Sequence, residues 1–391
     1  MFEWTIIGGG IQGCTLANYL LKAKRTTTSN LAIVDPNPEP LSTWKRCTNT
    51  IEMPYLRSPS IHHLDIDPFS LEKFAKSESG KQYDQFYGPY DRPAITLFNK
   101  HCESLFHDIQ LQKSWIQGRV EQLSRIRQHW QIKLSDGTQF ESENVVLAMG
   151  LSDHPYWPLW ANELQNQGAA VNHIYDDHTN TKVKETEEIL IVGGGISAIH
   201  TALKLSKIHP GRIKLLTRHP LRIQPFDSDP GWLGPKYMNS FKKVTNLNQR
   251  RQMISQARYR GSIPKELNLQ ALREERKGRL DIVIDEVSGA SYESGEIKVE
   301  LKTKSMVANR ILLATGFHAT PPGFDWLTST IESEGLRCAT CGYPIVSENS
   351  LEWGQNLYVI GALAELVIGP VSRNISGARR GAEKIVQLHS T

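Results

Sequence analysis

The chain has 391 residues, of which 39% are hydrophobic and 22% charged, and it carries a formal net charge of +4. This length exceeds what one hydrophobic core usually supports, so we expect two domains, or one domain inserted into the other. The scattered lysines and arginines give no reason to expect nucleic acid, the five cysteines do not suggest a secreted disulfide framework, and no apolar run is long enough to cross a bilayer.

The first predicted element is an apolar strand that starts almost at the N-terminus and runs into a turn with glycines at positions 8, 10 and 13. A helical pattern follows, and then a second strand that ends at Asp35. In a G-x-G-x-x-G turn, Gly8 would allow the tight turn, Gly10 would let the backbone approach a pyrophosphate, and Gly13 would let helix and strand pack closely. A carboxylate at the position of Asp35 accepts hydrogen bonds from a ribose. We therefore expect a dinucleotide here; the alternative is a plain glycine turn in an α/β protein.

A second unit of the same kind begins with the apolar strand 189–192. Its turn carries small residues at the three key positions, namely Gly193, Gly195 and Ala198. Where the first unit has Asp35, this unit has Arg218, and His219 and Arg222 add basic character nearby. A guanidinium can pair with a 2′-phosphate that a carboxylate would repel, so we expect NADPH rather than NADH. The alternative for Arg218 is an ordinary solvated arginine.

Each unit closes with a strand that ends in glycine, at Gly150 and at Gly316. An alternating segment, typical of a small antiparallel sheet, precedes each closing strand. The chain then continues through a strand pattern at 357–361 and a helical one from about Ser372 to His389, which we expect to return to the first domain. We predict an α/β fold of two Rossmann-like domains, the second inserted into the first: residues 1–183, residues 184–317 with a helical insertion at about 229–278, and residues 318–391.

Two glycine units in this order resemble the two-dinucleotide-binding flavoprotein superfamily, which has the glutathione reductase fold. The second turn, with Ser197 before Ala198, and the closing segment 313–317 resemble those of NADPH-dependent flavin monooxygenases. The stretches 53–59 and 90–93 are similar in layout to the lysine and ornithine N-hydroxylases. The resemblance implies FAD at the first unit and NADPH at the second.

The resemblance also implies which residues contact the two cofactors. Trp44 and Arg46 follow the first unit's second strand and would lie near the flavin, although Trp44 could equally be a core aromatic. Asn374 lies in the first turn of the final helix, whose N-terminus would stabilise negative charge on the reduced flavin. The residues expected to contact FAD or NADPH are Gly8, Gly10, Gly13, Asp35, Trp44, Arg46, Val120, Met149, Gly150, Gly193, Gly195, Ser197, Ala198, Arg218, Thr315, Gly316 and Asn374.

Cys338 and Cys341 form a Cys-x-x-Cys motif, which is the strongest competing signal. Such a pair can exchange disulfides, but in the thioredoxin reductases it lies early in the NADPH domain, whereas here it follows the second closing strand. The resemblance therefore implies a monooxygenase that acts on a small molecule with NADPH and O₂. A flavin disulfide reductase that uses Cys338 and Cys341 as catalytic residues, and a non-catalytic flavin-binding sensor, remain the alternatives. Without a second pair of ligands at suitable spacing, we expect no metal.

The strand pattern near the N-terminus leaves no room for a signal peptide, so we expect a cytoplasmic protein. We expect no nucleic-acid or membrane partner. The oligomeric state stays open, with a homo-oligomer as one option.

Overall fold

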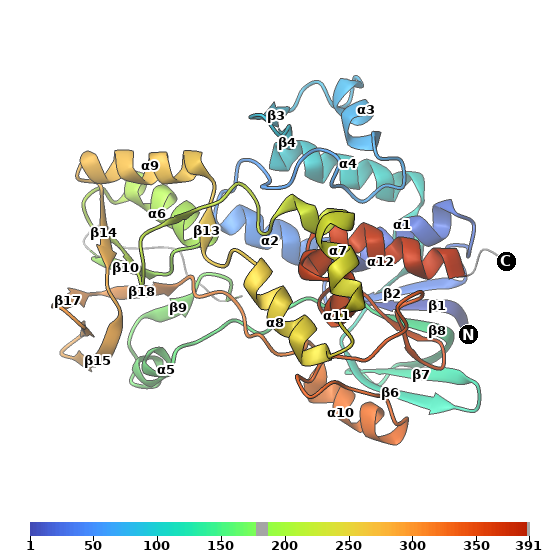
Figure 1. Ribbon diagram of the computed structural model, residues 1–391. Coiled ribbons are helices and arrows are strands. Elements are labelled where there is room, and N and C mark those ends of the chain that lie inside the picture. The colour runs from blue at the N-terminus through green and yellow to red at the C-terminus, as the bar shows by residue number, and fades with distance from the viewer. Residues whose placement is uncertain (177–186, 389–391) are drawn as a thin grey trace.

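Two sheets with parallel cores form the two halves of the computed structural model, which describes residues 1–176 and 187–388. They lie side by side, with the N-terminal sheet at the right of Figure 1. Its strand order is β19 (Glu352–Gly354), β20 (Leu357–Val359), β8 (Gln139–Leu147), β1 (Phe2–Ile7), β2 (Leu31–Asp35) and β5 (Trp115–Gln117). The order in the second sheet is β14 (Leu280–Ile284), β11 (Ile213–Thr217), β10 (Ile189–Val192), β18 (Arg310–Leu313) and β9 (Val171–His173). The predicted α/β fold with two Rossmann-like domains is confirmed.

The strands β1 and β10 occupy equivalent places in the two sheets, each between two parallel neighbours. In the first sheet, Ile6 pairs with Ile33 on one side and with Val146 on the other. Such central strands are buried on both faces, which explains their continuous apolar runs. Each is followed by a glycine turn and a helix, α1 (Ile11–Lys22) or α6 (Ile196–Ile208). Both turns therefore lie at the carboxyl ends of parallel strands, where open α/β sheets bind ligands.

A small antiparallel sheet precedes each closing strand, as the alternating patterns predicted. In the first domain β6 (Val120–Ile126) and β7 (His129–Leu134) lead into β8. In the second, β15 (Val287–Glu293), β16 (Glu296–Leu301) and β17 (Ser305–Ala308) lead into β18. Burial alternates along β7 and along β16: every second residue is buried, and the residues between are half-buried in β7 and exposed in β16.

After β18 the chain returns to the first domain. The helix α10 (Phe324–Ser333) packs against β6, and β20 joins the first sheet in parallel with β8. A short helix, α11 (Glu365–Ile368), and a 3-10 turn at Pro370–Arg373 then lead to α12 (Ile375–Leu388), which packs along α1. The expected last residue of this helix, His389, lies outside the described residues.

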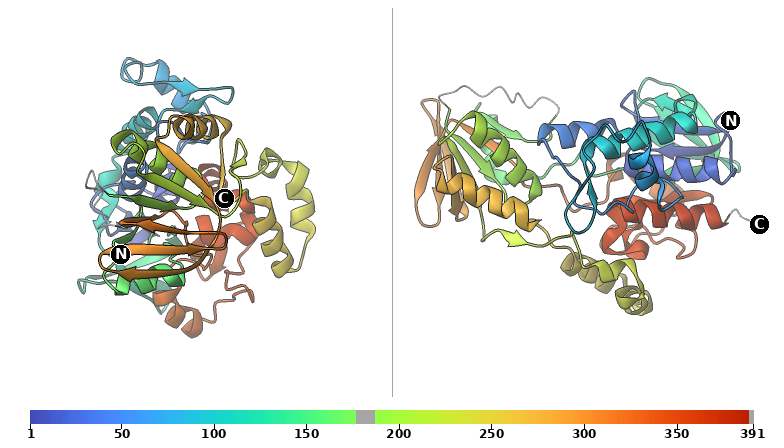
Figure 2. Two further views of the ribbon diagram at one scale, coloured as in Figure 1. Left: turned by 90° about the vertical axis from the view of Figure 1, so that its left-hand side faces the viewer. Right: turned by 90° about the horizontal axis from the view of Figure 1, so that it is seen from above.

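Two placements differ from the sequence-based boundaries. The boundary expected at residue 183 lies outside the described residues, but β9 already pairs with β18 of the second sheet before that point. Within the predicted insertion, α7 (Pro235–Lys243) and α8 (Leu247–Ala257) belong to the buried cluster of the first domain, through Phe241 and Ile254 among others. In contrast, α9 (Lys265–Arg276) packs on α6 of the second domain. The insertion therefore bridges the two domains (Figures 1 and 2).

The remaining elements surround these sheets. They are α2 (Ser42–Thr50), α3 (Ser70–Lys76), β3 (Phe86–Tyr87), β4 (Arg92–Pro93), α4 (Ile95–Asp108), α5 (Leu159–Asn166), β12 (Arg222–Ile223) and β13 (Ser262–Ile263). Across residues 1–176 and 187–388, each helix is too short or too polar to span a membrane.

Two histidines contact each other in the packed layer of α3 and α4. His101 on α4 is 2% exposed, its Nε2 lies 2.8 Å from the Ser70 hydroxyl, and its ring centroid lies 5.2 Å from that of His63. Burial lowers the pKa of His101 to about 3; His63 and Lys22 lower it further, and Asp65 opposes the shift. The folded protein therefore keeps this imidazole neutral.

We predict that the free energy of unfolding falls as the pH is lowered from about 7 to about 5. The reason is that the unfolded chain takes up a proton at His101 near pH 6.5 and the folded chain does not. Replacing His101 by Asn should remove about 2 kcal/mol of that loss. Urea unfolding of both proteins at the two pH values measures the difference. Equal losses in the wild type and the variant would contradict this prediction.

Candidate functional site

One large cavity lies between the two domains and reaches both glycine turns. Its volume is about 2880 Å³, well above the roughly 300–1,000 Å³ of pockets that hold one drug-sized molecule. Residues of the first unit, such as Asp35, and of the second, such as Arg218, line the same cavity. The space is therefore large enough for two dinucleotides that meet inside it.

The first glycine turn is built to admit an anion. At Gly8, φ is +112°, and a Cβ would lie 2.8 Å from the carbonyl oxygen of Ala148, so a side chain is strained there. A Cβ at Gly13 would lie 1.9 Å from the Gly8 oxygen, which shows how closely α1 packs on the turn. A Cβ at Gly10, in contrast, would meet no described atom within 4 Å. No described side chain caps α1, and its first turn carries no acid, so its free N–H groups fit a pyrophosphate.

Asp35 fixes the first turn as well as facing the cavity. Its Oδ2 accepts the backbone N–H of Gly9 at 2.7 Å, and its Oδ1 accepts the backbone N–H of Asn37 at 2.9 Å. A carboxylate has about four lone-pair positions, so it keeps capacity for a ribose hydroxyl. The arrangement fits the adenosine half of FAD.

The second turn repeats this geometry. At Gly193, φ is +147°, and a Cβ would lie 2.4 Å from the carbonyl oxygen of Ala314. Gly195 begins α6, and among the described residues no side chain caps that helix. Arg218 is exposed at the cavity wall and forms no ion pair within residues 1–176 and 187–388. Its neighbours on the wall include Arg222 and Arg260, so this end of the cavity fits a 2′-phosphate.

The cavity brings most of the predicted site residues together. Those that line it are Gly8, Gly10, Asp35, Trp44, Arg46, Val120, Met149, Gly150, Gly193, Gly195, Ser197, Arg218, Thr315, Gly316, Cys341 and Asn374. Gly13 and Ala198 are buried in α1 and α6 behind the turns, and neither they nor Cys338 lines the cavity.

The two residues expected near the flavin have specific partners. The Nε1–H of Trp44 donates to Asn99 Oδ1 at 3.1 Å, so its indole is tied to α4. Nη1 of Arg46 donates to the carbonyl oxygen of Tyr175 at 3.0 Å and so connects α2 with the second domain. Both residues line the cavity, and Arg46 also joins the two domains.

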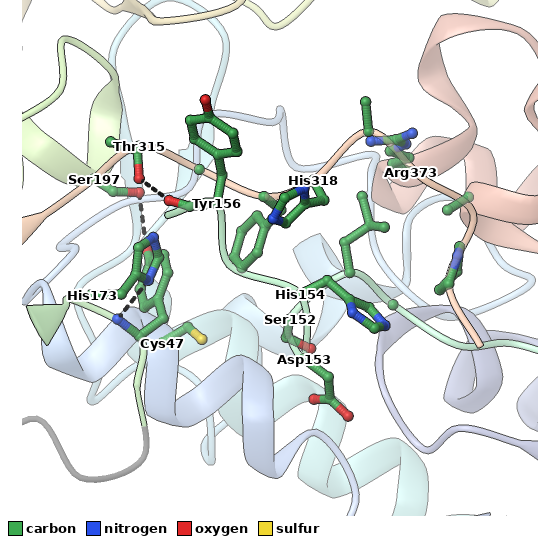
Figure 3. A pocket seen from close by; sticks show the side chains of 18 of the residues that line it. Cys47, Ser152, Asp153, His154, Tyr156, His173, Ser197, Thr315, His318 and Arg373 are labelled. Atoms are coloured by element: carbon green, nitrogen blue, oxygen red, sulfur yellow. Dashed lines mark hydrogen bonds between the residues drawn. The ribbon is translucent and has the colours of Figure 1, made fainter. Parts of the chain in front are cut away.

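Several aromatic and histidine side chains on the cavity wall were not predicted from the sequence (Figure 3). They lie on the two segments that join the domains. A backbone hydrogen bond of 2.9 Å, from the amide N–H of His318 to the carbonyl oxygen of His154, connects these segments. The rings of Tyr156 and His318 lie 5.2 Å apart. These segments follow the closing strands and carry no periodic pattern, so only their position after Gly150 and Gly316 could have indicated them.

A further contact joins the second turn to the wall. The Tyr175 hydroxyl lies 2.7 Å from Ser197 Oγ, and its ring stacks on Phe317 at 5.8 Å and 5°. Burial raises the pKa of Tyr175 to about 12. The phenol therefore keeps its proton at neutral pH and can act as a hydrogen-bond donor.

The cysteine pair lies at the border of the cavity. Cys341 lines it, whereas Cys338 does not. Burial, together with the neighbouring Cys341, raises the pKa of Cys338. A raised pKa disfavours the thiolate, which is the reactive form in disulfide exchange.

Comparison with known families agrees with this geometry. A family model described as FAD-NAD(P)-binding matches residues 5–152, and one described as pyridine nucleotide-disulphide oxidoreductase matches residues 108–268. The chain is 31% identical over 99 residues to ferroptosis suppressor protein 1 of Taeniopygia guttata. That match covers 25% of each protein, so it spans about a quarter of the curated relative. These matches confirm the predicted cofactor class, FAD and NAD(P).

Solved structures resemble the whole chain. An ornithine N-hydroxylase of Kutzneria sp. 744, solved with reduced FAD, NADP⁺ and L-ornithine, has a TM-score of 0.76 at 14% identity, covering 100% of this chain and 99% of that one. A bacillithiol disulfide reductase of Staphylococcus aureus has a TM-score of 0.60 at 14% identity, covering 99% and 97%. At such identities the likeness shows the fold alone, with the two Rossmann-like domains predicted from the sequence.

Proposed function

We propose that this chain is an FAD-dependent monooxygenase that is reduced by NADPH and oxygenates a small molecule with O₂, in the manner of the N-hydroxylases. The observation that carries the proposal is the single cavity that both glycine turns share, because a hydride can pass only between cofactors that meet. The likeness in fold to an ornithine N-hydroxylase over the whole chain supports it. Bound FAD would supply the chemistry by accepting hydride from NADPH and passing electrons to O₂.

The protein's own residues would bind, orient and shield these reactants. The N–H groups at the start of α1 would hold the FAD pyrophosphate, and Asp35 the ribose. The start of α6 would hold the NADPH pyrophosphate, and Arg218 its 2′-phosphate. Tyr156 and His318 would help to keep water from the reacting centre. The expected cytoplasmic location and the oligomeric state stay predictions.

A flavin disulfide reductase is the second candidate, because Cys341 lines the cavity and a matching family model carries that description. The position of Cys338 outside the cavity lining and its raised pKa weigh against it. The disulfide reductase also resembles the chain less closely than the hydroxylase, with TM-scores of 0.60 and 0.76.

One experiment separates these candidates. The purified flavoprotein is reduced with NADPH in the absence of O₂ and then mixed with O₂, and the wild type is compared with Cys338→Ser and Cys341→Ser. We predict prompt reduction and unchanged O₂ consumption in both variants. Loss of turnover in either variant would favour the disulfide reductase, and a flavin that NADPH never reduces would favour a non-catalytic sensor.

A further inference from the structure

A buried cluster of charges lies between the helical insertion and the return segment. Glu365 on α11 is fully buried, with 0% of its side chain exposed. Its carboxylate accepts hydrogen bonds from Arg258 and Arg373, each at 3.0 Å, and from Arg251 on α8. We call these four residues the arginine cluster. Arg251 and Arg258 belong to the helical insertion, and Glu365 and Arg373 belong to the return segment.

The arginine cluster has more positive than negative charge. Three guanidinium groups share one carboxylate, so two positive charges remain without a carboxylate partner in the cluster. The other acceptors among the described residues are neutral: Arg258 Nε donates to the Pro370 carbonyl at 3.1 Å, Arg373 Nη2 to the Tyr343 hydroxyl at 2.8 Å, and Arg251 Nη2 to the Ala319 carbonyl at 3.3 Å. Uncompensated buried charge is costly, and a bound anion removes that cost.

Arg258 is the member with an unused donor. Its Nη1 is buried and has no hydrogen-bond partner among the described residues. Burial lowers the pKa of Arg258 to about 10, with Glu365 opposing the shift and Arg373 and Arg251 adding to it. The group is still a cation at neutral pH, and because Arg258 lines the cavity, its positive charge acts on a molecule that is held there.

The arginine cluster borders the cavity at the end next to the first glycine turn. Arg258 and Arg373 line the cavity, and so does Asn374. Gln12 in α1 donates through Nε2 to the carbonyl oxygens of Ser372 and Asn374, both at 3.3 Å, so the segment with Arg373 is fixed to the start of α1. Figure 3 shows Arg373 on the cavity wall, near His318. The surplus charge therefore lies beside Asn374, which the sequence predicts to contact the flavin.

We infer that the molecule oxygenated in this cavity carries a carboxylate, which binds Arg258 and Arg373. A charge-assisted hydrogen bond to a guanidinium is favourable for a carboxylate, whereas an ammonium group would meet two surplus positive charges. The surplus thus selects an acidic small molecule over a diamine. The inference rests on the proposed function for the reaction, but binding itself can be measured without turnover.

The test compares two five-carbon probes of opposite charge, glutarate and cadaverine, with neutral glutaramide as the isosteric control. Isothermal titration calorimetry on the purified, oxidised protein without NADPH gives each Kd. We expect glutarate to bind at least about tenfold more tightly than either of the others, as one charge-assisted hydrogen bond requires. Cadaverine binding as tightly as glutarate, or no glutarate binding at all, would overturn the inference, whether or not NADPH reduces the flavin.

Substitutions at four arginines locate the bound anion. Arg258→Gln should raise the Kd of glutarate at least about tenfold, and Arg258→Lys should raise it less. Arg260→Gln makes the same change two residues away on the cavity wall and should leave the Kd of glutarate unchanged. If Arg260→Gln or Arg218→Ala raises the Kd of glutarate as much as Arg258→Gln does, the anion occupies the end of the cavity at Arg218 and the inference is wrong. If Arg258→Gln fails to fold, Arg373→Gln tests the same prediction from the other side of Glu365.

Discussion

Replacing Gly10 by Asp is expected to abolish FAD binding and to leave the fold intact. Gly10 has φ −80° and ψ −166°, which any residue adopts, and a Cβ there would meet no described atom within 4 Å. Aspartate is also a favourable residue at a helix N-cap, so α1 should be at least as stable. Its carboxylate, however, would accept the N–H groups and fill the space that the pyrophosphate needs. We expect FAD affinity to fall at least about 100-fold, because the new carboxylate and the FAD pyrophosphate are both negative and compete for the same N–H groups.

The flavin content of the purified variant, read from its visible absorbance, measures this effect, and far-ultraviolet circular dichroism checks the fold. Gly195→Asp is the matched control, because Gly195 occupies the same place before α6 and a Cβ there would meet only the Gly261 Cα at 3.6 Å. That variant should keep its flavin and lose reduction by NADPH. A Gly10→Asp protein that retains FAD as the wild type does would show that the first turn does not hold the pyrophosphate.

Replacing Arg218 by Ala is expected to weaken the binding of NADPH by about 10- to 100-fold, because a charge-assisted contact with the 2′-phosphate is lost. Arg218 is exposed and forms no ion pair in the described part of the chain, so its loss should not affect folding. NADH lacks the 2′-phosphate and serves as the internal control. The concentration dependence of flavin reduction by each nucleotide gives both values. If the affinities for NADPH and NADH fall by the same factor, Arg218 does not contact the 2′-phosphate.

The repeated glycine units could be predicted because their physical requirements are local in sequence. The turn at Gly8 needs a positive φ, and the close approach of α1 to the turn excludes a side chain at Gly13. Buried parallel strands such as β1 also produce continuous apolar runs. Each of these constraints acts within a short stretch of sequence, so the spacing of residues indicated the fold and the two turns at which we propose that the cofactors bind.

The arginine cluster could not be predicted, because its charges are far apart in the sequence. Arg258 and Glu365 are separated by 107 residues, and no periodicity connects a loop after α8 with α11. Its assembly depends on the helical insertion packing against the first domain, through residues such as Phe241. The sequence indicated that insertion by resemblance and composition, which do not specify the surface on which a helix packs.

We propose that FAD at the first turn and NADPH at the second meet in one cavity. Mixing the purified protein with NADPH, and separately with NADH, in the absence of O₂ tests it most directly through the loss of oxidised flavin absorbance. We predict that both nucleotides reduce the flavin, and that NADPH does so at lower concentrations than NADH. A bound flavin that stays oxidised with either nucleotide would contradict it.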